Sequence, residues 1–408
     1  MRATKVGVGK KVLVGFSGGL SSRVLLHHIC AFHAVDPRKN RKFSGLTICH
    51  VDQRAIVGGE NHTETLRSIV ESYGHSLAVI PLEDIFGDDS RTFVQTQSGN
   101  EDTLSLHVKG VTSSAGSKVE KLQRCFTSIG KLSSKEDLLH YLTMQLLYET
   151  ARSTQCSAVI LGDNSTRVAI RVMTQISKGR GFSMPLDVAS ESTWLPDLML
   201  LRPLRDVDSK EIALCNQYEN LKSVHVPNLT TGMPVKSSID RLTEDFITGL
   251  QRDFPSTVST VARTAFKTPT RWNAEGVERC ALCNGPIPPD AINWRSRHTV
   301  SSFSTSTTTS TTSPPPTDAT CSTDCGITGS CCSPTPTSSD PFDLALHLCY
   351  GCQNFIRDAR DEAELVKKRG GEVVPVTLPG YVGETVDKAR GREWMRKEIG
   401  EFLVEDDE

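Results

Sequence analysis

The chain has 408 residues, enough for two domains or for one large domain with insertions. Its 46 lysines and arginines nearly balance 48 aspartates and glutamates, and the net charge of −2 excludes a globally basic surface; a nucleic-acid-binding surface would be a local patch. No apolar run is long enough to span a bilayer or to form a signal-peptide core, which predicts a soluble cytoplasmic protein with no membrane partner.

The segment from residue 11 to residue 22 predicts a buried strand, a tight loop and a helix in immediate succession. An apolar run at 12–16 indicates a parallel strand, and from Ser21 onward apolar residues recur at helical spacing. A helix N-terminus after a glycine loop presents free N–H groups to an anion. We therefore expect a phosphate or pyrophosphate site, or alternatively a turn without a ligand; the candidate residues are Ser17, Gly18, Gly19, Ser21 and Ser22.

Further strands are expected at 46–51, 77–81, 158–162 and 198–201, with helical patterns between them at 61–73 and 168–176. Strands that alternate with helices predict an α/β fold with a doubly wound parallel sheet. In such a sheet the ligand crevice lies at the carboxyl ends of the strands. Asp52 follows the second strand, so it either lies near a bound nucleotide or caps a loop.

Between 87 and 131 the helical periodicity disappears, and we expect a mobile polar insertion there. Capping-box patterns at Ser134–Asp137 and Asp208–Glu211 predict two further helix starts. Near the C-terminus, 389–403 predicts a helix that packs on the main body and leads into an acidic tail.

Two Cys-x-x-Cys pairs lie far apart in the sequence and together supply the ligands of a tetrahedral structural zinc site. The tract between them, 299–341, is rich in Ser, Thr and Pro and is expected to be a disordered insertion. It contains four more cysteines, interpreted as incidental thiols rather than rival ligands. The expected metal ligands are Cys280, Cys283, Cys349 and Cys352.

These patterns divide the chain into five parts. They are an α/β domain (1–86 and 132–270), a polar insertion (87–131), a zinc-knuckle region (271–298 and 342–384), a disordered insertion (299–341), and a C-terminal helix with an acidic tail (385–408).

The loop Ser17-Gly-Gly-Leu-Ser-Ser22 resembles the Ser-Gly-Gly-Lys-Asp-Ser motif of the PP-loop ATP pyrophosphatases, whose fold is of the adenine nucleotide alpha hydrolase type. Leu20 stands at the lysine position and Ser21 at the aspartate position. Gly162-Asp-Asn164 and Val226-Pro-Asn228 resemble two further landmarks of the tRNA-thiolation members, without the cysteines that the catalytic members carry. The resemblance thus implies the fold, while ATP and Mg²⁺ are not expected in this chain.

With Leu348-Cys-Tyr-Gly-Cys352 included, the chain resembles the family of degenerate, non-catalytic subunits of the cytoplasmic tRNA wobble-uridine thiolation complex. The resemblance implies a heterodimer with a catalytic PP-loop paralogue. That pair would transfer sulfur from a thiocarboxylated ubiquitin-like carrier to C2 of U34 in tRNA Lys, Gln and Glu. Two alternatives remain: an active adenylating tRNA-modifying enzyme, and a zinc-ribbon scaffold without a tRNA role.

A tRNA-phosphate patch is expected on the helix after the fourth strand, because two arginines lie one turn apart and two further cations follow. The alternative is an ordinary solvated helix face. The four candidates are Arg167, Arg171, Lys178 and Arg180.

Overall fold

A computed structural model describes most of the chain. The described residues are 10–34, 43–87, 91–95, 106–108, 116–267, 277–289, 291, 344–370 and 376–402. The predicted disordered insertion at 299–341, with its four cysteines, and the acidic tail lie outside these residues. None of the described helices combines the length and apolar character needed to cross a membrane.

A six-stranded sheet in the order β3-β2-β1-β6-β8-β7 forms the centre of the fold. Five strands run parallel, and short β7 pairs antiparallel with β8 at one edge. The predicted parallel α/β sheet is therefore confirmed. Its strands are β1 (Lys11–Gly15), β2 (Gly45–Asp52), β3 (Leu77–Pro81), β6 (Cys156–Ile160), β7 (Glu191–Ser192) and β8 (Met199–Leu201).

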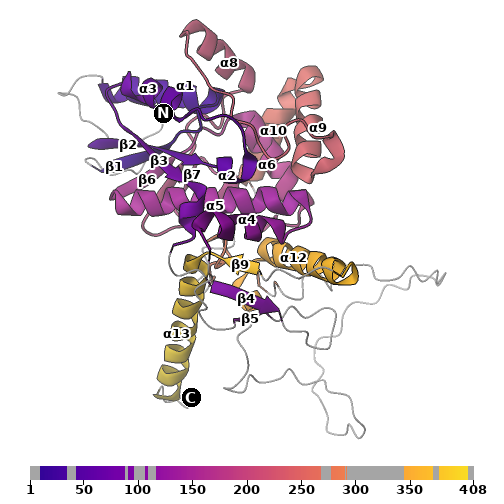
Figure 1. The fold of residues 1–408 in the computed structure, drawn as a ribbon. Helices are drawn as coiled ribbons and strands as arrows, with labels where there is room; N and C mark the ends of the chain where they lie inside the picture. The colour runs from indigo at the N-terminus through magenta and orange to yellow at the C-terminus, as the bar shows by residue number, and fades with distance from the viewer. Residues whose placement is uncertain are drawn as a thin grey trace, which may run out of the picture.

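Helices cover both faces of this sheet, because side chains of successive strand residues point to opposite faces (Figure 1). Val12 and Val14 pack with residues of α1 (Leu20–Ala34) and α8 (Ser209–Tyr218), and α3 (Thr63–Glu71) covers the same face. Leu13 faces the long helix α5 (Leu132–Ser153) and shares its hydrophobic core.

The remaining helices of this part lie beside the sheet and beneath it. They are α2 (Arg54–Val57), α4 (Lys118–Thr127), α6 (Ser165–Ser177), α7 (Met184–Val188), α9 (Ile239–Asp253) and α10 (Pro255–Lys267), with short 3₁₀ turns at Leu82–Ile85 and Val235–Ser237. Helix α6 packs between α7, α9 and α10 through two small apolar clusters.

Two local predictions about this region are wrong. The expectation of a mobile insertion at 87–131 fails at α4, where Leu122, Cys125 and Phe126 recur at helical spacing and are buried in the α5 core. The expected cap at Ser134 fails because α5 begins at Leu132, after Lys131. By contrast, the capping box of α8, formed by Asp208 and Glu211, is confirmed.

The C-terminal residues pack on the far side of α5 (Figure 1). They form a 3₁₀ turn (Leu344–His347), α12 (Tyr350–Lys368), β9 (Val376–Leu378) and α13 (Gly380–Phe402). Strand β9 joins β4 (Arg91–Gln95) and β5 (Leu106–Val108) in a small antiparallel sheet. The predicted C-terminal helix is thus present and begins earlier, at Gly380. The cysteine region shares one hydrophobic core with α4 and α5.

Candidate functional site

The loop between β1 and α1 has the predicted strand–loop–helix geometry. Gly18 has a φ of +84°, in the left-handed region, and a Cβ atom there would lie 2.4 Å from Cδ2 of Leu66. The position therefore requires glycine for two independent reasons. The same contact shows that the loop packs closely on Leu66, a buried residue of the hydrophobic core.

The loop residues are brought together, and their hydroxyl groups bond to neighbouring protein groups. The Oγ atoms of Ser17 and Ser22 are 3.1 Å apart, and Ser22 also donates to the carbonyl of Gly19 at 2.9 Å. Asn164, at the start of α6, donates to the Ser21 hydroxyl at 3.2 Å. These hydrogen bonds make the loop compact and connect it to the start of α6.

No positive charge points into the loop from residues 17–23, all of which the structure describes. Leu20, at the position of the motif lysine, is 46% exposed. Arg23 is buried and turned away, donating to the Lys222 carbonyl at 3.1 Å and to the Tyr73 hydroxyl at 2.9 Å. The cradle therefore offers backbone N–H groups and the helix dipole, without a side-chain cation for a triphosphate.

Asp52 lies at the end of β2 and is bound by the residue two positions later. Its Oδ1 accepts from the Arg54 backbone N–H at 3.0 Å, and its Oδ2 lies 2.6 Å from Nη2 of the same arginine. These hydrogen bonds hold the pKa of Asp52 below its ordinary value. This geometry matches the loop-capping alternative, since the carboxylate organises the start of α2.

The four cations proposed for tRNA binding do not form one open patch. Arg171 pairs with Asp163 at 3.3 Å, Lys178 pairs with Asp137 at 3.0 Å and with Asp240, and Arg180 pairs with Asp137 at 2.7 Å. Arg180 also donates to the Tyr141 hydroxyl. Only Arg167 of the four is exposed.

Asp163, at the carboxyl end of β6, was not expected to matter structurally. Its Oδ2 accepts from Arg202 Nε at 3.0 Å and from Arg171 at 3.3 Å. Burial opposes its ionisation, yet the two arginines outweigh burial and hold its pKa at about 2. No sequence signal pointed to Arg202, which lies 39 residues away.

The four predicted metal ligands lie together. All four Sγ atoms are within 4.8 Å of one another, and those of Cys283 and Cys349 are 3.6 Å apart. A tetrahedral zinc ion with Zn–S bonds of about 2.3 Å needs sulfur–sulfur edges of about 3.8 Å, whereas a disulfide needs about 2.0 Å. The four free thiols therefore fit a zinc ion as ligands.

Backbone hydrogen bonds hold the two cysteine pairs in place. In the first pair, the Cys280 N–H donates to the Gly285 carbonyl at 2.8 Å and the Gly285 N–H lies 3.4 Å from Cys283 Sγ. The Ala281 N–H donates to the His347 carbonyl at 2.9 Å, which joins the first pair to the second. The second pair lies at the start of α12, with Cys349 as its N-cap residue.

Charge and polar contacts around the cluster come from the α/β part of the chain. The Arg180 side chain packs on Gly351, where a Cβ atom would lie 2.1 Å from its Nε. Trp194 donates to the Asn284 carbonyl at 2.6 Å. Burial opposes ionisation of Cys280, yet hydrogen bonds from the neighbouring thiols lower its pKa well below the ordinary value. Neighbouring thiols raise the pKa of Cys283, and burial raises the pKa of Cys352, both well above the ordinary value, so the four thiols do not ionise together without a metal.

Known proteins resemble the chain along nearly its whole length. The family model of cytoplasmic tRNA 2-thiolation protein 2 matches residues 238–354. The Rattus norvegicus protein of that name is 30% identical over 449 residues, covering 98% of this chain and 82% of the relative. The Homo sapiens protein is 29% identical over 453 residues, covering 98% and 85%.

Solved structures also resemble this fold at low sequence identity. The U34-tRNA thiolase NcsA from Methanococcus maripaludis, solved with its 4Fe–4S cluster, matches with a TM-score of 0.46 and 14% identity, covering 66% of this chain and 77% of its own. The NMN synthetase from Francisella tularensis matches with a TM-score of 0.35 and 12% identity, covering 64% and 88%.

The relative that is 30% identical spans almost the entire chain, and the family model independently covers the first cysteine pair and the second. The chain therefore belongs to the cytoplasmic tRNA 2-thiolation protein 2 family.

Proposed function

We propose that this chain is the non-catalytic subunit of a cytoplasmic complex that 2-thiolates the wobble uridine, U34, of tRNA. Its family name supplies the reaction and the compartment. The working partner is a PP-loop paralogue with an intact Ser-Gly-Gly-Lys-Asp-Ser motif, bound as a heterodimer. The substrates are tRNA Lys, Gln and Glu, and the sulfur comes from a thiocarboxylated ubiquitin-like carrier.

The observation that carries this proposal is that none of residues 17–23, all of them described, points a cationic side chain into the loop. Activation of the uridine oxygen as an adenylate requires ATP, and the triphosphate needs a cation. Leu20 is apolar, and Arg23 is turned away. Asp52 is bound to Arg54 as well, so the residues present do not fit ATP with Mg²⁺. No catalytic step is assigned to this chain.

Sulfur handling also argues for a partner. Of the five described thiols outside the four-cysteine cluster, those of Cys30, Cys49 and Cys125 are buried and burial raises their pKa to between about 11 and about 12, while Cys156 is buried and Cys215 is half-exposed. Thiols with so high a pKa are poor nucleophiles at neutral pH. The cluster itself has four thiolate ligands for zinc and no open position, which suits a structural ion.

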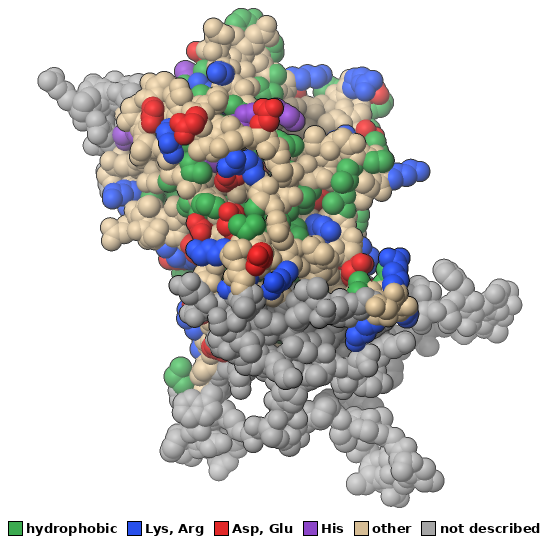
Figure 2. Space-filling view, viewed as in Figure 1, with side chains coloured by type: hydrophobic (Ala, Val, Ile, Leu, Met, Phe, Trp, Pro, Cys, Tyr) green, Lys and Arg blue, Asp and Glu red, His purple; other side chains and the backbone are tan. Residues whose placement is uncertain are grey.

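Within this function, the chain supports the catalytic subunit and extends the surface that binds tRNA. Figure 2 shows lysine and arginine side chains interspersed with acidic ones over the described part of one face. Arg167 stays a candidate tRNA contact because it is exposed. For Arg171, Lys178 and Arg180, the ion pairs compete with any phosphate contact.

Reconstitution tests the proposal. The chain, the paralogue that copurifies with it, and the mixture are each incubated with ATP, tRNA and the thiocarboxylated carrier, and 2-thiouridine is measured by mass spectrometry. We expect thiolation only from the mixture. Pyrophosphate release by the chain alone, abolished by Ser17→Ala, would establish the active-enzyme alternative. Normal wobble thiolation in cells that lack the chain would establish the scaffold alternative.

A further inference from the structure

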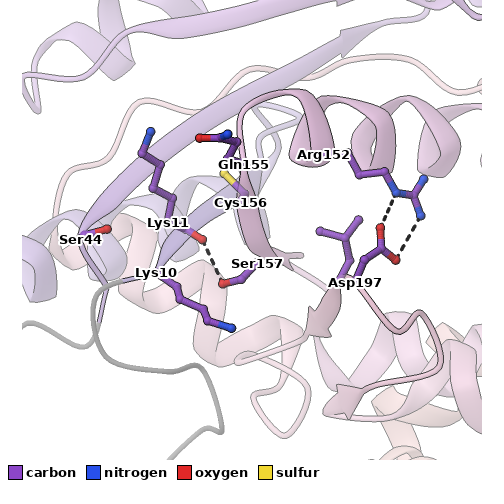
Figure 3. A pocket seen from close by; sticks show the side chains of 9 residues that line it. Lys10, Lys11, Ser44, Arg152, Gln155, Cys156, Ser157 and Asp197 are labelled. Atoms are coloured by element: carbon purple, nitrogen blue, oxygen red, sulfur yellow. Dashed lines mark hydrogen bonds and ion pairs between the residues drawn. The ribbon is translucent and has the colours of Figure 1, made fainter.

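An open depression of about 560 Å³ lies at the amino ends of β1 and β6 (Figure 3). It is on the edge of the sheet opposite the Ser17–Ser22 loop, about 17 Å away along the five residues of β1. Its lining residues are Lys10, Lys11, Ser44, Arg152, Gln155, Cys156, Ser157, Asp197 and Leu198.

The lining carries a net positive charge. Lys10 and Lys11 are exposed, and neither forms an ion pair with an acidic residue among the nine that line the depression. Asp197, the one carboxylate of the lining, is bound by Arg152, whose Nε and Nη2 donate to its two oxygens at 2.5 and 3.5 Å. The two lysine charges are therefore left uncompensated within the depression.

Neutral donors lie beside these charges. Ser44 and Gln155 contribute hydroxyl and amide groups, while the Ser157 hydroxyl donates to the Lys11 carbonyl at 3.3 Å. Gln155 has a φ of +57°, in the left-handed region, where only a few residues other than glycine occur. Its backbone N–H closes the tight turn between α5 and β6 by donating to the Arg152 carbonyl at 3.0 Å. Backbone strain of this kind often accompanies a functional position.

We propose that this depression binds the phosphate backbone of tRNA, an inference that rests on the proposed function. Lys10 and Lys11 are consecutive, and Figure 3 shows their side chains leaving the chain in different directions. A single small anion would not meet both ammonium groups, whereas a chain of phosphates meets separated point charges in turn. The free cations are lysines, which suit backbone contacts without base readout.

The cations of this depression differ from the four candidate cations on and after α6 in whether they form ion pairs. At α6, three of four cations are held in ion pairs with Asp137, Asp163 and Asp240. At the amino edge of the sheet, two of three are open to an incoming polyanion. Of these two groups of cations, the one at the amino edge has more charge available to a polyanion.

Fluorescence anisotropy with labelled tRNA tests this site on the full chain purified with its bound partner. We expect the double variant Lys10→Glu, Lys11→Glu to bind at least about ten-fold more weakly at 0.1 M salt, and the slope of log K against log salt to fall by about two. The matched control is Lys210→Glu, an exposed lysine at the start of α8, which should change affinity less than two-fold. All three affected residues are on the surface, so thermal midpoints should agree.

A variant with the opposite sign sharpens the test. Asp197→Asn frees Arg152, and binding should tighten about two- to five-fold. Equal affinities for the double variant and Lys210→Glu would overturn the site. Displacement of tRNA by inorganic phosphate, beyond that by chloride at equal ionic strength, would also overturn it in favour of a small-anion site. If the wild-type complex bound no tRNA at all, the proposed function would fail instead.

Discussion

The loop after β1 has the backbone geometry of a binding site but lacks its charged side chain, whereas the four-cysteine cluster has all the side chains of one. The loop has the backbone of a phosphate cradle, with Gly18 in the left-handed region, but Leu20 supplies no charge. The cluster has every side chain that a zinc ion needs, held by hydrogen bonds from three separate segments. The loop thus lacks the side-chain chemistry that its backbone could support, whereas the cluster has a complete ligand set.

Position in the core explains this difference. Three of the four cysteines are buried and Cys283 is half-buried, all in the same hydrophobic core as α4 and α5, so a substitution at these positions disturbs the packing. Leu20 lies at the rim of the crevice, half exposed, where a change of side chain disturbs little packing. Each prediction below tests one side of this comparison.

The largest effect is expected at the metal site. Cys349→Ser should abolish zinc binding and lower the free energy of unfolding by at least about 4–5 kcal/mol, because a structural metal stabilises only the folded state. Zinc content by mass spectrometry and denaturant unfolding measure the two effects. Cys215→Ser is the control, since that thiol is half-exposed and lies outside the cluster. A Cys349→Ser protein with one zinc per chain and unchanged unfolding would refute the structural role.

A smaller effect is expected from the ion pairs at the carboxyl edge of the sheet. The pKa of Asp163 is about 2 in the folded chain against an ordinary value of 3.8, so its contribution is complete above pH 4 and is lost as pH falls through about 2. The shift corresponds to about 2 kcal/mol. The difference in unfolding free energy between wild type and Asp163→Asn should therefore shrink between pH 4 and pH 2.

Denaturant unfolding at pH 5, 4, 3 and 2 measures that difference. Asp84→Asn serves as the control, because Asp84 forms an exposed pair with Lys118 and surface pairs contribute little. If the difference in unfolding free energy between wild type and Asp163→Asn stayed constant over this range, the ionised Asp163 carboxylate would not be the group that neutralises Arg171 and Arg202. The arginines at the carboxyl edge of the sheet would then be available to a ligand instead of being held in ion pairs.

Local chemistry was the part of the fold that the sequence predicted well. The strand–loop–helix at residues 11–22 and the capping box at Asp208 depend on neighbours in the chain, and both are present. The N-cap of α5 was misplaced by three residues, at Ser134 instead of Lys131, because Ser134 forms the capping pattern within the first turn of the helix. Helix α4 was missed because its apolar residues are few and its burial depends on α5.

Contacts between residues far apart in the sequence were the hardest part of the site to predict. The Cys-x-x-Cys spacing was sufficient to join residues 66 positions apart, since thiolates in pairs have few other uses. An arginine on a helix can pair with many kinds of group, so its place in the sequence does not identify its partner. Arg171 and Arg180 gave a plausible phosphate patch, but their charges are taken up by Asp163 and Asp137, and nothing in the sequence pairs them.

The smallest effect is expected at Leu20, and it tests whether charge alone separates this loop from an ATP site. Leu20→Lys should change the free energy of unfolding by no more than about 0.5 kcal/mol, because the side chain is 46% exposed. We expect no ATP binding by calorimetry and no pyrophosphate release, since Asp52 stays paired with Arg54 and Ser21 still stands at the position of the motif aspartate. Leu242→Lys, at a 49% exposed leucine of α9, controls for the added charge. Specific ATP binding by Leu20→Lys alone would instead show an intact cradle that lacks a single cation.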